Sequence, residues 1–458
     1  MTLAETLRGE LGVDGAVVSD DPAVLAAHRG DKWFAAEEPE AVVFARSTTD
    51  VVALLRFASK HKIPVTARGA GYGYVGGCVP ARRGVALSLM RMNRIREIHF
   101  ADAIAVVEPG VITADLKAAA RRQKLFYPPD PASEKDCSIG GNVATNAGGP
   151  RCLKYGVTRN YVLGLEVVLA SGELLRLGGR VHKNKTGFDL IGLFVGSEGM
   201  LGVVTEITLR LLPLPPARAT ISAAFATMSE AAAAVQEIFA AGFLPSSLEI
   251  ADSFTLEAAR HELGQSLVPA GNAHLLVDLD GQEESVASEA AALQNLLARQ
   301  KPNALELARG EVACEKMWAL RREFSNSLRA TGLTKLNQDV VVPRSRIVDL
   351  VDFAAALQAK HGFPIACFGH AGDGNVHVNV MAADYEDPAV HARVDTALDE
   401  LFAQVLAWGG VITGEHGIGL AKKRWWPEAT SEAVRKVHQQ LKAVLDPHGI
   451  LNPGKFLD

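Results

Sequence analysis

The sequence feature that most restricts the fold is the density of glycine in the first third of the chain. Eleven of the 42 glycines in 458 residues lie between Gly69 and Gly149. Glycine costs conformational entropy on folding, so a chain that concentrates it locally is usually bringing its backbone close to another group. Phosphates and flat cofactors are common groups of this kind. The stretch therefore predicts a binding surface made largely of backbone.

Composition and charge exclude several classes of protein. With 48% hydrophobic and 22% charged residues, the chain can bury a large core in more than one domain, which excludes a disordered chain. A net charge of −5 without a long run of one sign gives no electrostatic footprint for nucleic acid. The five cysteines are scattered and form no C-x-x-C pair, which is typical of reduced cytosolic thiols.

The chain carries no signal for membrane insertion or secretion. No run of about 18 apolar residues is free of charge, and the N-terminal segment has an acidic residue where a signal peptide would be apolar. We therefore expect a cytoplasmic protein that is not integral to a membrane. The basic run 422–424 could contact a membrane or an acceptor protein, although a solvated surface is its commoner role, so a peripheral location stays open.

Periodicity predicts a mixed α/β N-terminal half and a second domain. A strand at 41–46, a helix at 51–61 and a strand at 63–68 form a β-α-β pattern. A strand at 104–110 and a helix at 114–123, with Thr113 as its N-cap, begin a second such pattern. Alternating strands follow, and the first is broken by a hairpin turn at Ser171-Gly172.

The prolines at 213, 215 and 216 are the best linker signal, and they place the main boundary near 215. Beyond them, two further β-α-β-like passes suggest a ferredoxin-like second domain. These passes comprise helices at 226–242 and 284–300 and strands at 247–252 and 273–280.

The first glycine-rich segment, 64–80, contains the dinucleotide-binding pattern Gly71-x-Gly73-x-x-Gly76. A Rossmann fold also requires a helix that starts there and an acidic residue about 20 positions later. An apolar strand follows instead, and the residues near position 93 carry no acid. We therefore reject a Rossmann fold in favour of an anion-binding loop with Arg68 at its entrance, and a merely flexible loop is the alternative.

Two more glycine-rich segments follow. In the segment 130–156, two pairs of glycines flank two side-chain amides and a hydroxyl group. A flat ring could lie against the glycine backbone while these side chains form hydrogen bonds with its polar edge. These residues are Gly140, Gly141, Asn142, Thr145, Asn146, Gly148 and Gly149. The segment 183–209 adds Gly196, Ser197, Glu198, Gly199 and Gly202.

Two histidines flank a predicted turn between apolar strands at 364–380. A hairpin closed there would place His370 and His377 across from each other, with Asn379 on the face of His377. Glu415 and His416 adjoin in another glycine-rich turn. Two imidazoles and one carboxylate leave coordination positions open, as catalytic metal sites do. The alternative is that each histidine only caps a loop or fills a pocket.

Together these motifs resemble the FAD-binding domain of the vanillyl-alcohol oxidase/p-cresol methylhydroxylase superfamily. From about residue 40 to the end, the chain is similar to the branch that contains the flavoprotein of glycolate oxidase, D-lactate dehydrogenase and D-2-hydroxyglutarate dehydrogenase. The resemblance implies an α+β fold with a two-subdomain FAD-binding domain of the p-cresol methylhydroxylase type at 1–215. A ferredoxin-like substrate or cap domain would follow at 216–440, and the segment 441–458 would return to the FAD domain.

The resemblance also assigns cofactor roles. The pyrophosphate would lie against Arg68, Gly69, Ala70, Gly71, Tyr72, Gly73, Gly76 and Gly77. The ribityl chain and flavin ring would lie along Pro131, Ser138, Ile139, Gly140, Gly141, Asn142, Thr145, Asn146, Gly148 and Gly149. The adenosine side would adjoin Glu198, Gly199, Gly202 and Val203, and Asn452 and Lys455 would lie near the flavin. No histidine occurs from 62 to 98, so we expect non-covalent FAD, with Cys78 and Cys137 as packing residues.

The resemblance assigns a divalent metal, Zn or Mn, to His370, His377 and Glu415, and the catalytic base to His416. A nearby cation would favour the neutral, proton-accepting form of this histidine. The carboxylate of an α-hydroxy acid needs a cation, and arginine binds it through its planar fork. By the resemblance, the residues that bind this carboxylate are Arg321, Ser325 and Lys335. The segment from Ser325 to Lys335 is one residue shorter here than in the hydroxyglutarate enzymes. Arg322 would turn toward solvent.

The implied reaction is oxidation of a D-2-hydroxy acid, with hydride transfer from C2 to flavin N5 and a hydrogen bond from Asn379 to the same hydroxyl. The electron acceptor would be a quinone, a cytochrome, an electron-transfer flavoprotein or an iron–sulfur subunit. Two alternatives are synthase chemistry like that of alkyl-dihydroxyacetonephosphate synthase and a flavin-carrying subunit that is active only with partners. A homodimer stays open.

Overall fold

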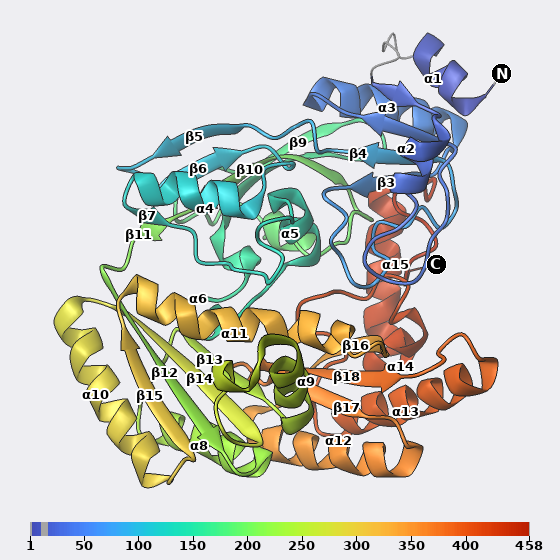
Figure 1. The fold of residues 1–458 in the computed structure, drawn as a ribbon. Coiled ribbons are helices and arrows are strands. Elements are labelled where there is room, and N and C mark those ends of the chain that lie inside the picture. The colour runs from blue at the N-terminus through green and yellow to red at the C-terminus, as the bar shows by residue number, and fades with distance from the viewer. Residues whose placement is uncertain (1, 11–16, 458) are drawn as a thin grey trace. The chain divides into compact units, whose positions relative to one another are not determined.

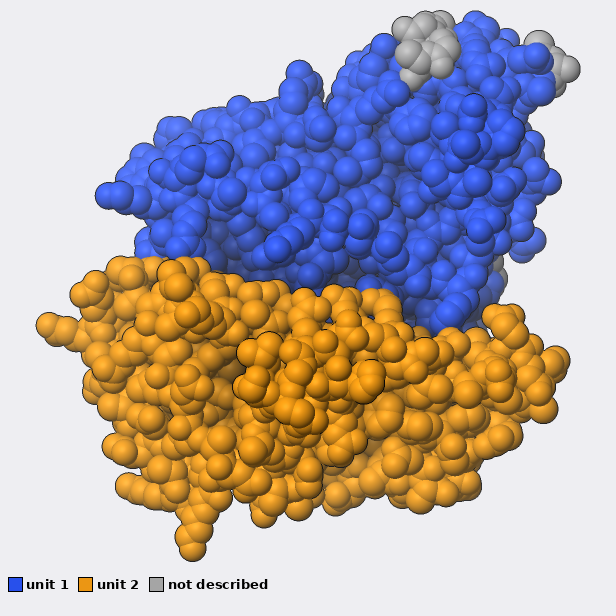
Figure 2. Space-filling model, in the orientation of Figure 1, with its two compact units in different colours: residues 1–148, 157–214, 415–458 blue, residues 149–156, 215–414 orange. Residues whose placement is uncertain are grey.

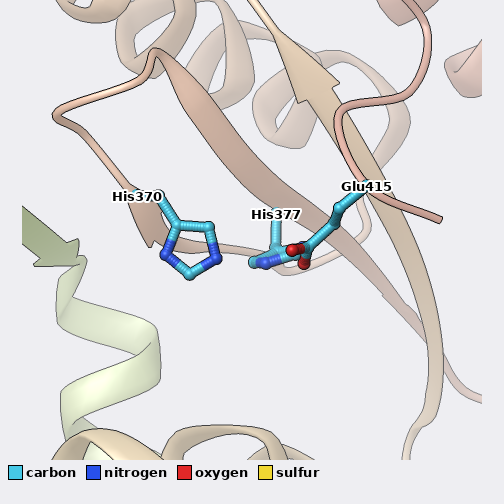
Figure 3. A group of neighbouring side chains, drawn as sticks. All are labelled: His370, His377 and Glu415. Carbon is cyan, nitrogen blue, oxygen red and sulfur yellow. The ribbon is translucent and has the colours of Figure 1, made fainter. Parts of the chain in front are cut away.

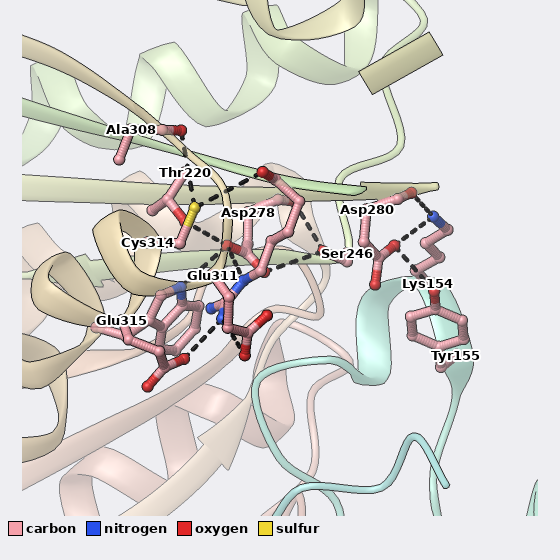
Figure 4. Close-up of polar contacts among 12 residues, drawn as sticks. Lys154, Tyr155, Thr220, Ser246, Asp278, Asp280, Ala308, Glu311, Cys314 and Glu315 are labelled. Atoms are coloured by element: carbon pink, nitrogen blue, oxygen red, sulfur yellow. Dashed lines mark hydrogen bonds and ion pairs between the residues drawn. The ribbon is translucent and has the colours of Figure 1, made fainter. Parts of the chain in front are cut away.

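The structure is a computed structural model that describes residues 2–10 and 17–457. The chain forms two compact units (Figure 2). The first comprises residues 1–148, 157–214 and 415–458, and the second comprises 149–156 and 215–414. The short segment 149–156 joins the second unit because Lys154 Nζ and Tyr155 Oη donate to Asp280 Oδ1, at 2.6 and 2.9 Å (Figure 4).

The first unit begins with a small, mostly parallel sheet in the order β1-β2-β4-β3 (Figure 1). Its strands are β1 (Val18–Ser19), β2 (Ala41–Phe44), β3 (Val65–Arg68) and β4 (Val85–Ser88). The helices here are α1 (Leu3–Glu10), α2 (Pro22–Ala27) and α3 (Thr48–His61). The predicted β-α-β pattern around α3 is confirmed, with Ser47 as the N-cap that accepts from the Asp50 amide.

The second sheet of this unit is antiparallel, in the order β5-β6-β10-β8-β9. Its strands are β5 (Ile95–His99), β6 (Ile104–Val107), β8 (Val162–Val168), β9 (Leu174–Gly178) and β10 (Val203–Arg210). The hairpin turn at Ser171-Gly172 is confirmed. The second β-α-β unit is wrong, because β6 pairs antiparallel with both neighbours.

Thr113 is also not the N-cap of α4 (Thr113–Arg122). Ile112 occupies that position, and the Thr113 hydroxyl bonds the Cys137 carbonyl at 3.3 Å. The remaining elements of the unit are short apart from the last helix. They are β7 (Leu125–Phe126), α5 (Ile139–Thr145), η1 (Thr158–Tyr161), α7 (Leu190–Phe194), β11 (Leu212–Pro213), η4 (Lys423–Trp425), α14 (Trp426–Ala429) and α15 (Glu432–Leu445).

The second unit is built on one antiparallel seven-stranded sheet in the order β15-β12-β14-β13-β17-β18-β16 (Figure 1). Its first four strands are β12 (Ala217–Phe225), β13 (Ser247–Ala251), β14 (Ala273–Gly281) and β15 (Ala304–Arg309). With α8 (Met228–Ala240) and α10 (Glu283–Arg299) they form the β-α-β-β-α-β arrangement of a ferredoxin-like unit.

The other three strands repeat most of this arrangement. They are β16 (Thr334–Val341), β17 (Ile365–His370) and β18 (Asn375–Ala382), with α12 (Ile347–His361) and α13 (Pro388–Ala407). A fourth strand is reduced to one bridge between Val341 and Val411. The two halves meet where β13 pairs with β17, so the predicted ferredoxin-like domain is two such units joined edge to edge.

Helices cover both faces of this sheet. α8, α10, α12 and α13 pack on one face, and α9 (Ser253–Leu263) and α11 (Glu311–Ala330) pack on the other (Figure 1). The remaining short helices are α6 (Cys152–Tyr155), η2 (Gln265–Leu267) and η3 (Arg344–Arg346). Over residues 2–10 and 17–457, no helix has both the length and the apolarity needed to cross a bilayer.

Candidate functional site

The face of the sheet beneath α9 and α11 carries the polar residues of interest in the second unit. Residues directly opposite each other on paired strands share a face, and Glu249 lies opposite His370 while Phe368 lies opposite His377. The partner of His370 across the hairpin is Asn375, so the two histidines are diagonal neighbours and not opposite each other as predicted. Their ring centroids are nevertheless only 5.5 Å apart.

His370, His377 and Glu415 form the group expected from the sequence (Figure 3). One ligand atom from each lies within 4.8 Å of the others. Glu415 follows directly after Gly414, whose amide donates to Asp339 Oδ2 at 2.9 Å. Asp339 also accepts from the Thr413 hydroxyl at 3.0 Å and therefore fixes the turn that leads to Glu415.

The donor set of this group fits a divalent cation. Two imidazole nitrogens and one carboxylate oxygen are typical of catalytic zinc sites, which keep further positions open for water or substrate. Both histidines are buried, at 5% and 6% exposure. These residues would hold the metal that the sequence predicts, and its presence stays a prediction.

Arg321 reaches the same sheet face from α11. Its Nε atom donates to Glu249 Oε2 at 2.8 Å, and its Nη2 atom forms an ion pair with the same oxygen at 2.6 Å. The other carboxylate oxygen of Glu249 lies 2.7 Å from His370 Nδ1. Burial would raise the pKa of Glu249, but His370 and Arg321 outweigh it and hold this pKa below its usual value. Glu249 is therefore a buried carboxylate that joins two predicted site residues.

Ser325 and Lys335 complete the cationic end of the site. Ser325 lies one turn beyond Arg321 on α11 and accepts from Lys335 Nζ at 2.7 Å. Both cations stack on one ring, because Arg321 Cζ and Lys335 Nζ lie 5.0 and 5.4 Å from the Phe368 centroid. The structure thus brings the three predicted carboxylate-binding residues together. Arg322 pairs with Glu315 and is half exposed, as expected.

The side chain of Lys335 has a pKa well below that of an ordinary lysine. Burial, assisted by Arg329 and Arg321, lowers the pKa of Lys335 to about 7. The unfolded chain therefore binds a proton between about pH 7 and 10 that the folded chain lacks, so the free energy of unfolding rises with pH across this window.

We expect Lys335→Met to remove that rise and to stabilise the protein at pH 6 by up to about 5 kcal/mol, since the pKa falls from 10.5 to about 7 and one pKa unit is worth about 1.4 kcal/mol. Urea unfolding at pH 6, 8 and 10 measures this effect, with Lys360→Met on an exposed lysine as the control. Equal stability of Lys335→Met and the parent at all three pH values would contradict the burial of a costly charge.

A second buried carboxylate fixes α11 on the sheet (Figure 4). Asp278 of β14 accepts from Arg218 Nε at 2.9 Å, from the Thr220 hydroxyl at 2.5 Å and from Trp318 Nε1 at 3.1 Å. Trp318 precedes Arg321 by three residues on α11, so this contact sets the position of the arginine.

We expect Asp278→Asn to lower the free energy of unfolding by about 3–5 kcal/mol, because it leaves a buried arginine partly unpaired. Glu311→Gln is the matched control, since Glu311 pairs with the same Arg218 at 3.8 Å but is half exposed. That variant should change stability by less than about 1 kcal/mol. Urea unfolding compares the two, and equal losses would contradict the anchoring role of Asp278.

Asn379 lies two residues after His377 on the same face of β18. Its amide nitrogen donates to the Ala366 and His377 carbonyls, both at 3.0 Å. Its buried Oδ1 has no hydrogen-bond partner among the described residues, and neither has Oδ1 of Asn337, which lies opposite it on β16. Both oxygens can accept from a hydroxyl group.

In the first unit, the glycine-rich loop after β3 packs tightly. A Cβ at Gly69 would lie 2.3 Å from Ser138 Oγ, so a larger residue would displace the N-cap hydroxyl of α5. Gly71 has φ of +74°, which also favours glycine. Arg68 bonds the Gly30 carbonyl and donates to Cys78 Sγ at 3.1 Å, so its guanidinium lies at the loop as predicted.

The second glycine-rich segment folds into α5. Ser138 is its N-cap and accepts from the Gly141 amide at 3.3 Å, and a Cβ at Gly140 would lie 2.5 Å from Pro109 Cβ. Asn142 is buried and donates to the Thr113 hydroxyl at 2.7 Å. Gly140 and Asn142 therefore support α5 from inside the unit.

The third segment meets the C-terminal part of the chain. Both oxygens of buried Glu198 accept backbone amides, from Ile418 at 2.8 Å and from Gly419 at 2.9 Å. Its side chain thus fixes the loop that carries His416, whose ring centroid lies 5.3 Å from that of Tyr74. Lys422 is buried, at 1% exposure, so the predicted solvated run 422–424 is wrong at this residue.

Asn452 connects two of the predicted cofactor segments. Its side-chain amide donates to the Gly77 carbonyl at 2.9 Å and to the Glu198 carbonyl at 2.8 Å. Its buried Oδ1 has no partner among the described residues and can accept from a bound N–H or O–H group. A dinucleotide cofactor with a polar ring edge fits this arrangement, and Lys455 is held nearby by the Val79 carbonyl.

Three residues of the site were missed from the sequence: Glu249, Asp339 and Phe368. Glu249 is an isolated acid in the mostly apolar strand β13, and that isolation was the available signal for it. Asp339 gave no such signal, because β16 carries several other polar residues. Phe368 gave no signal, because an aromatic residue in an apolar strand is normally a core residue.

Comparisons with known families agree with this geometry. The FAD binding domain family matches residues 39–178, and the family of FAD linked oxidases, C-terminal domain, matches residues 214–456. Glycolate oxidase subunit GlcD of Bacillus subtilis is 39% identical over 91% of this chain and 89% of that protein. D-lactate dehydrogenase of Anaerostipes hadrus is 35% identical over the same shares.

D-2-hydroxyglutarate dehydrogenase of Xanthomonas citri is 34% identical over 100% of this chain and 98% of its own length. Among solved structures, p-cresol methylhydroxylase matches with a TM-score of 0.81, at 20% identity over 99% of this chain and 96% of that chain. This likeness establishes the predicted fold. The chain therefore belongs to the FAD-linked oxidases, with an FAD-binding domain of the p-cresol methylhydroxylase type, and is an FAD-dependent oxidoreductase.

Proposed function

We propose that this protein oxidises a D-2-hydroxy acid of the lactate, glycolate or 2-hydroxyglutarate class to the 2-oxo acid. One observation carries the proposal: two pairs of residues meet at the same face of the sheet in the second unit. One pair is Arg321, from α11, with Lys335, and the other is His370 with His377. A carboxylate binds the first pair, and an adjacent hydroxyl suits the second. The relatives named as dehydrogenases of lactate and hydroxyglutarate support this substrate class.

Each residue of the proposed site has a separate role in the reaction. Arg321 binds the substrate carboxylate through Nη1, which has no hydrogen-bond partner among the described residues, and Lys335 Nζ neutralises the remaining charge. Asn379 Oδ1 is buried without a partner among the described residues, so it can accept a hydrogen bond from the bound hydroxyl group before the proton passes to His416. His416 accepts the hydroxyl proton. Non-covalent FAD, when bound, supplies a two-electron acceptor, and a zinc or manganese ion at His370, His377 and Glu415 supplies Lewis acidity.

A second candidate has support from one comparison. The relative from Bacillus subtilis is named a subunit of glycolate oxidase. In this alternative proposal, the chain is the flavin-carrying part of a larger assembly. A quinone, a cytochrome, an electron-transfer flavoprotein or an iron–sulfur subunit would then take the electrons. We place the protein in the cytoplasm.

Dye reduction by the FAD-loaded chain tests the proposal. We expect D-lactate, glycolate or D-2-hydroxyglutarate to reduce the dye, L-lactate to be inactive, and dipicolinate to abolish the activity until Zn²⁺ or Mn²⁺ is restored. Activity that appears only with added partner proteins would favour the subunit alternative. Equal rates with both enantiomers of lactate would contradict the proposed site.

A further inference from the structure

One buried carboxylate contacts both ends of the proposed site. Glu249 is 1% exposed, and each of its oxygens serves a different partner. Oε1 lies 2.7 Å from His370 Nδ1, and Oε2 accepts a hydrogen bond from Arg321 Nε at 2.8 Å and forms an ion pair with Nη2 at 2.6 Å. Glu249 lies directly opposite His370 where the two ferredoxin-like halves of the sheet meet.

The contact with His370 determines which ring nitrogen can bind a metal. An ionised carboxylate only accepts hydrogen bonds, so the proton of neutral His370 must lie on Nδ1. The Nε2 lone pair is then available to a cation, and the carboxylate makes the imidazole a stronger ligand. Without this partner, a neutral histidine can equally carry its proton on Nε2 and lose its capacity as a ligand through that atom.

The contact with Arg321 fixes the guanidinium in a similar way. Two of its donor atoms are held by Glu249, and the Phe368 ring lies 5.0 Å from Cζ. The guanidinium plane is therefore fixed, and Nη1 is directed away from the carboxylate. An arginine fixed before substrate binding loses less side-chain entropy when it binds a carboxylate.

We propose that Glu249 is a positioning residue that prepares His370 for the metal and Arg321 for the substrate carboxylate at the same time. This inference rests on the proposed function, because it assigns Glu249 to the support of that same site. The competing explanation is that Glu249 only balances the charge of buried Arg321.

Glu249→Gln separates the two explanations with Zn²⁺ as the probe. Gln keeps the shape of the side chain but offers one acceptor and one NH₂ group in place of two acceptors. We expect the Zn²⁺ dissociation constant of the FAD-loaded full chain to rise about 10–100-fold, as is typical when a partner of a metal ligand is lost. Equilibrium dialysis against chelator-buffered Zn²⁺ measures it without any turnover.

Asp278→Asn is the matched control. Asp278 is a buried carboxylate that anchors the same helix through Trp318, but it has no hydrogen bond to His370. This variant should lose stability and keep the Zn²⁺ affinity of the parent. Equal Zn²⁺ affinities of Glu249→Gln and the parent would overturn the positioning role alone. A parent that binds no Zn²⁺ would overturn it together with the metal assistance in the proposed function.

A measurement on the parent covers the case in which Glu249→Gln fails to fold. Nitrogen-15 NMR of histidine-labelled protein, freed of metal and loaded with FAD, reports the tautomer of each ring. We expect the signals that disappear in His370→Asn to be those of the Nδ1–H tautomer. The Nε2–H tautomer at His370 would overturn the proposal.

Discussion

His377→Ala is expected to abolish binding of the divalent metal and to lower kcat by about 1,000-fold or more. A metal that polarises the reacting hydroxyl is worth several kcal/mol, and each 1.4 kcal/mol is about a factor of ten in rate. His377 is central in β18, at 6% exposure, and its ring lies 5.4 Å from the Phe368 centroid, so little else can replace its nitrogen.

Metal content by mass spectrometry and the rate of flavin reduction under single turnover measure this effect. His274→Gln is the matched control, because His274 is a buried histidine on the same sheet that bonds Ser222 and not the metal group. It should retain the metal. An His377→Ala protein that keeps a full equivalent of metal and turns over at more than a tenth of the parent rate would contradict the assigned site.

The second large effect is expected at His416. Its replacement by Gln should lower the rate of flavin reduction by about 100–10,000-fold, which is the usual contribution of a positioned base. Glu198 fixes the loop through the Ile418 and Gly419 amides, so the loss should come from the missing base and not from a displaced loop. The KM for the hydroxy acid should change little, since we propose that Arg321 and Lys335, and not His416, bind its carboxylate.

Tyr74→Phe keeps the ring beside His416 and serves as the control, with a rate within a few-fold of the parent. Stopped-flow absorbance at the flavin band resolves the chemical step in both variants. A rate for His416→Gln within threefold of the parent would assign the proton to another acceptor. A large rise in KM without loss of rate would instead indicate a role in substrate binding.

Much of the fold could be predicted because its signals are local. The helix at 48–61 has a serine N-cap and a continuous apolar stripe, and the 365–382 hairpin has two apolar strands around a short glycine-containing turn. Thr113 failed as an N-cap because its hydroxyl bonds the Cys137 carbonyl, a contact 24 residues away. Strand pairing and such contacts are set by the tertiary structure.

In the site, too, local signals could be predicted and tertiary contacts could not. His370, His377 and Glu415 lie in short motifs and could be predicted. The register of the hairpin could not, and this register makes the two histidines diagonal neighbours. Glu249 is 121 residues from His370 in sequence and could not be assigned to it. Its role depends on the pairing of β13 with β17, which joins two halves of a sheet that share no local signal.

Anaerobic titration of the FAD-loaded chain with D-lactate, glycolate and D-2-hydroxyglutarate shows whether this site oxidises 2-hydroxy acids. We expect at least one of these acids to bleach the flavin absorbance near 450 nm, L-lactate to leave it unchanged, and dipicolinate to prevent the bleaching. A flavin that none of the acids reduces, with metal present and Arg321 intact, would contradict the assignment of this site to 2-hydroxy acid oxidation.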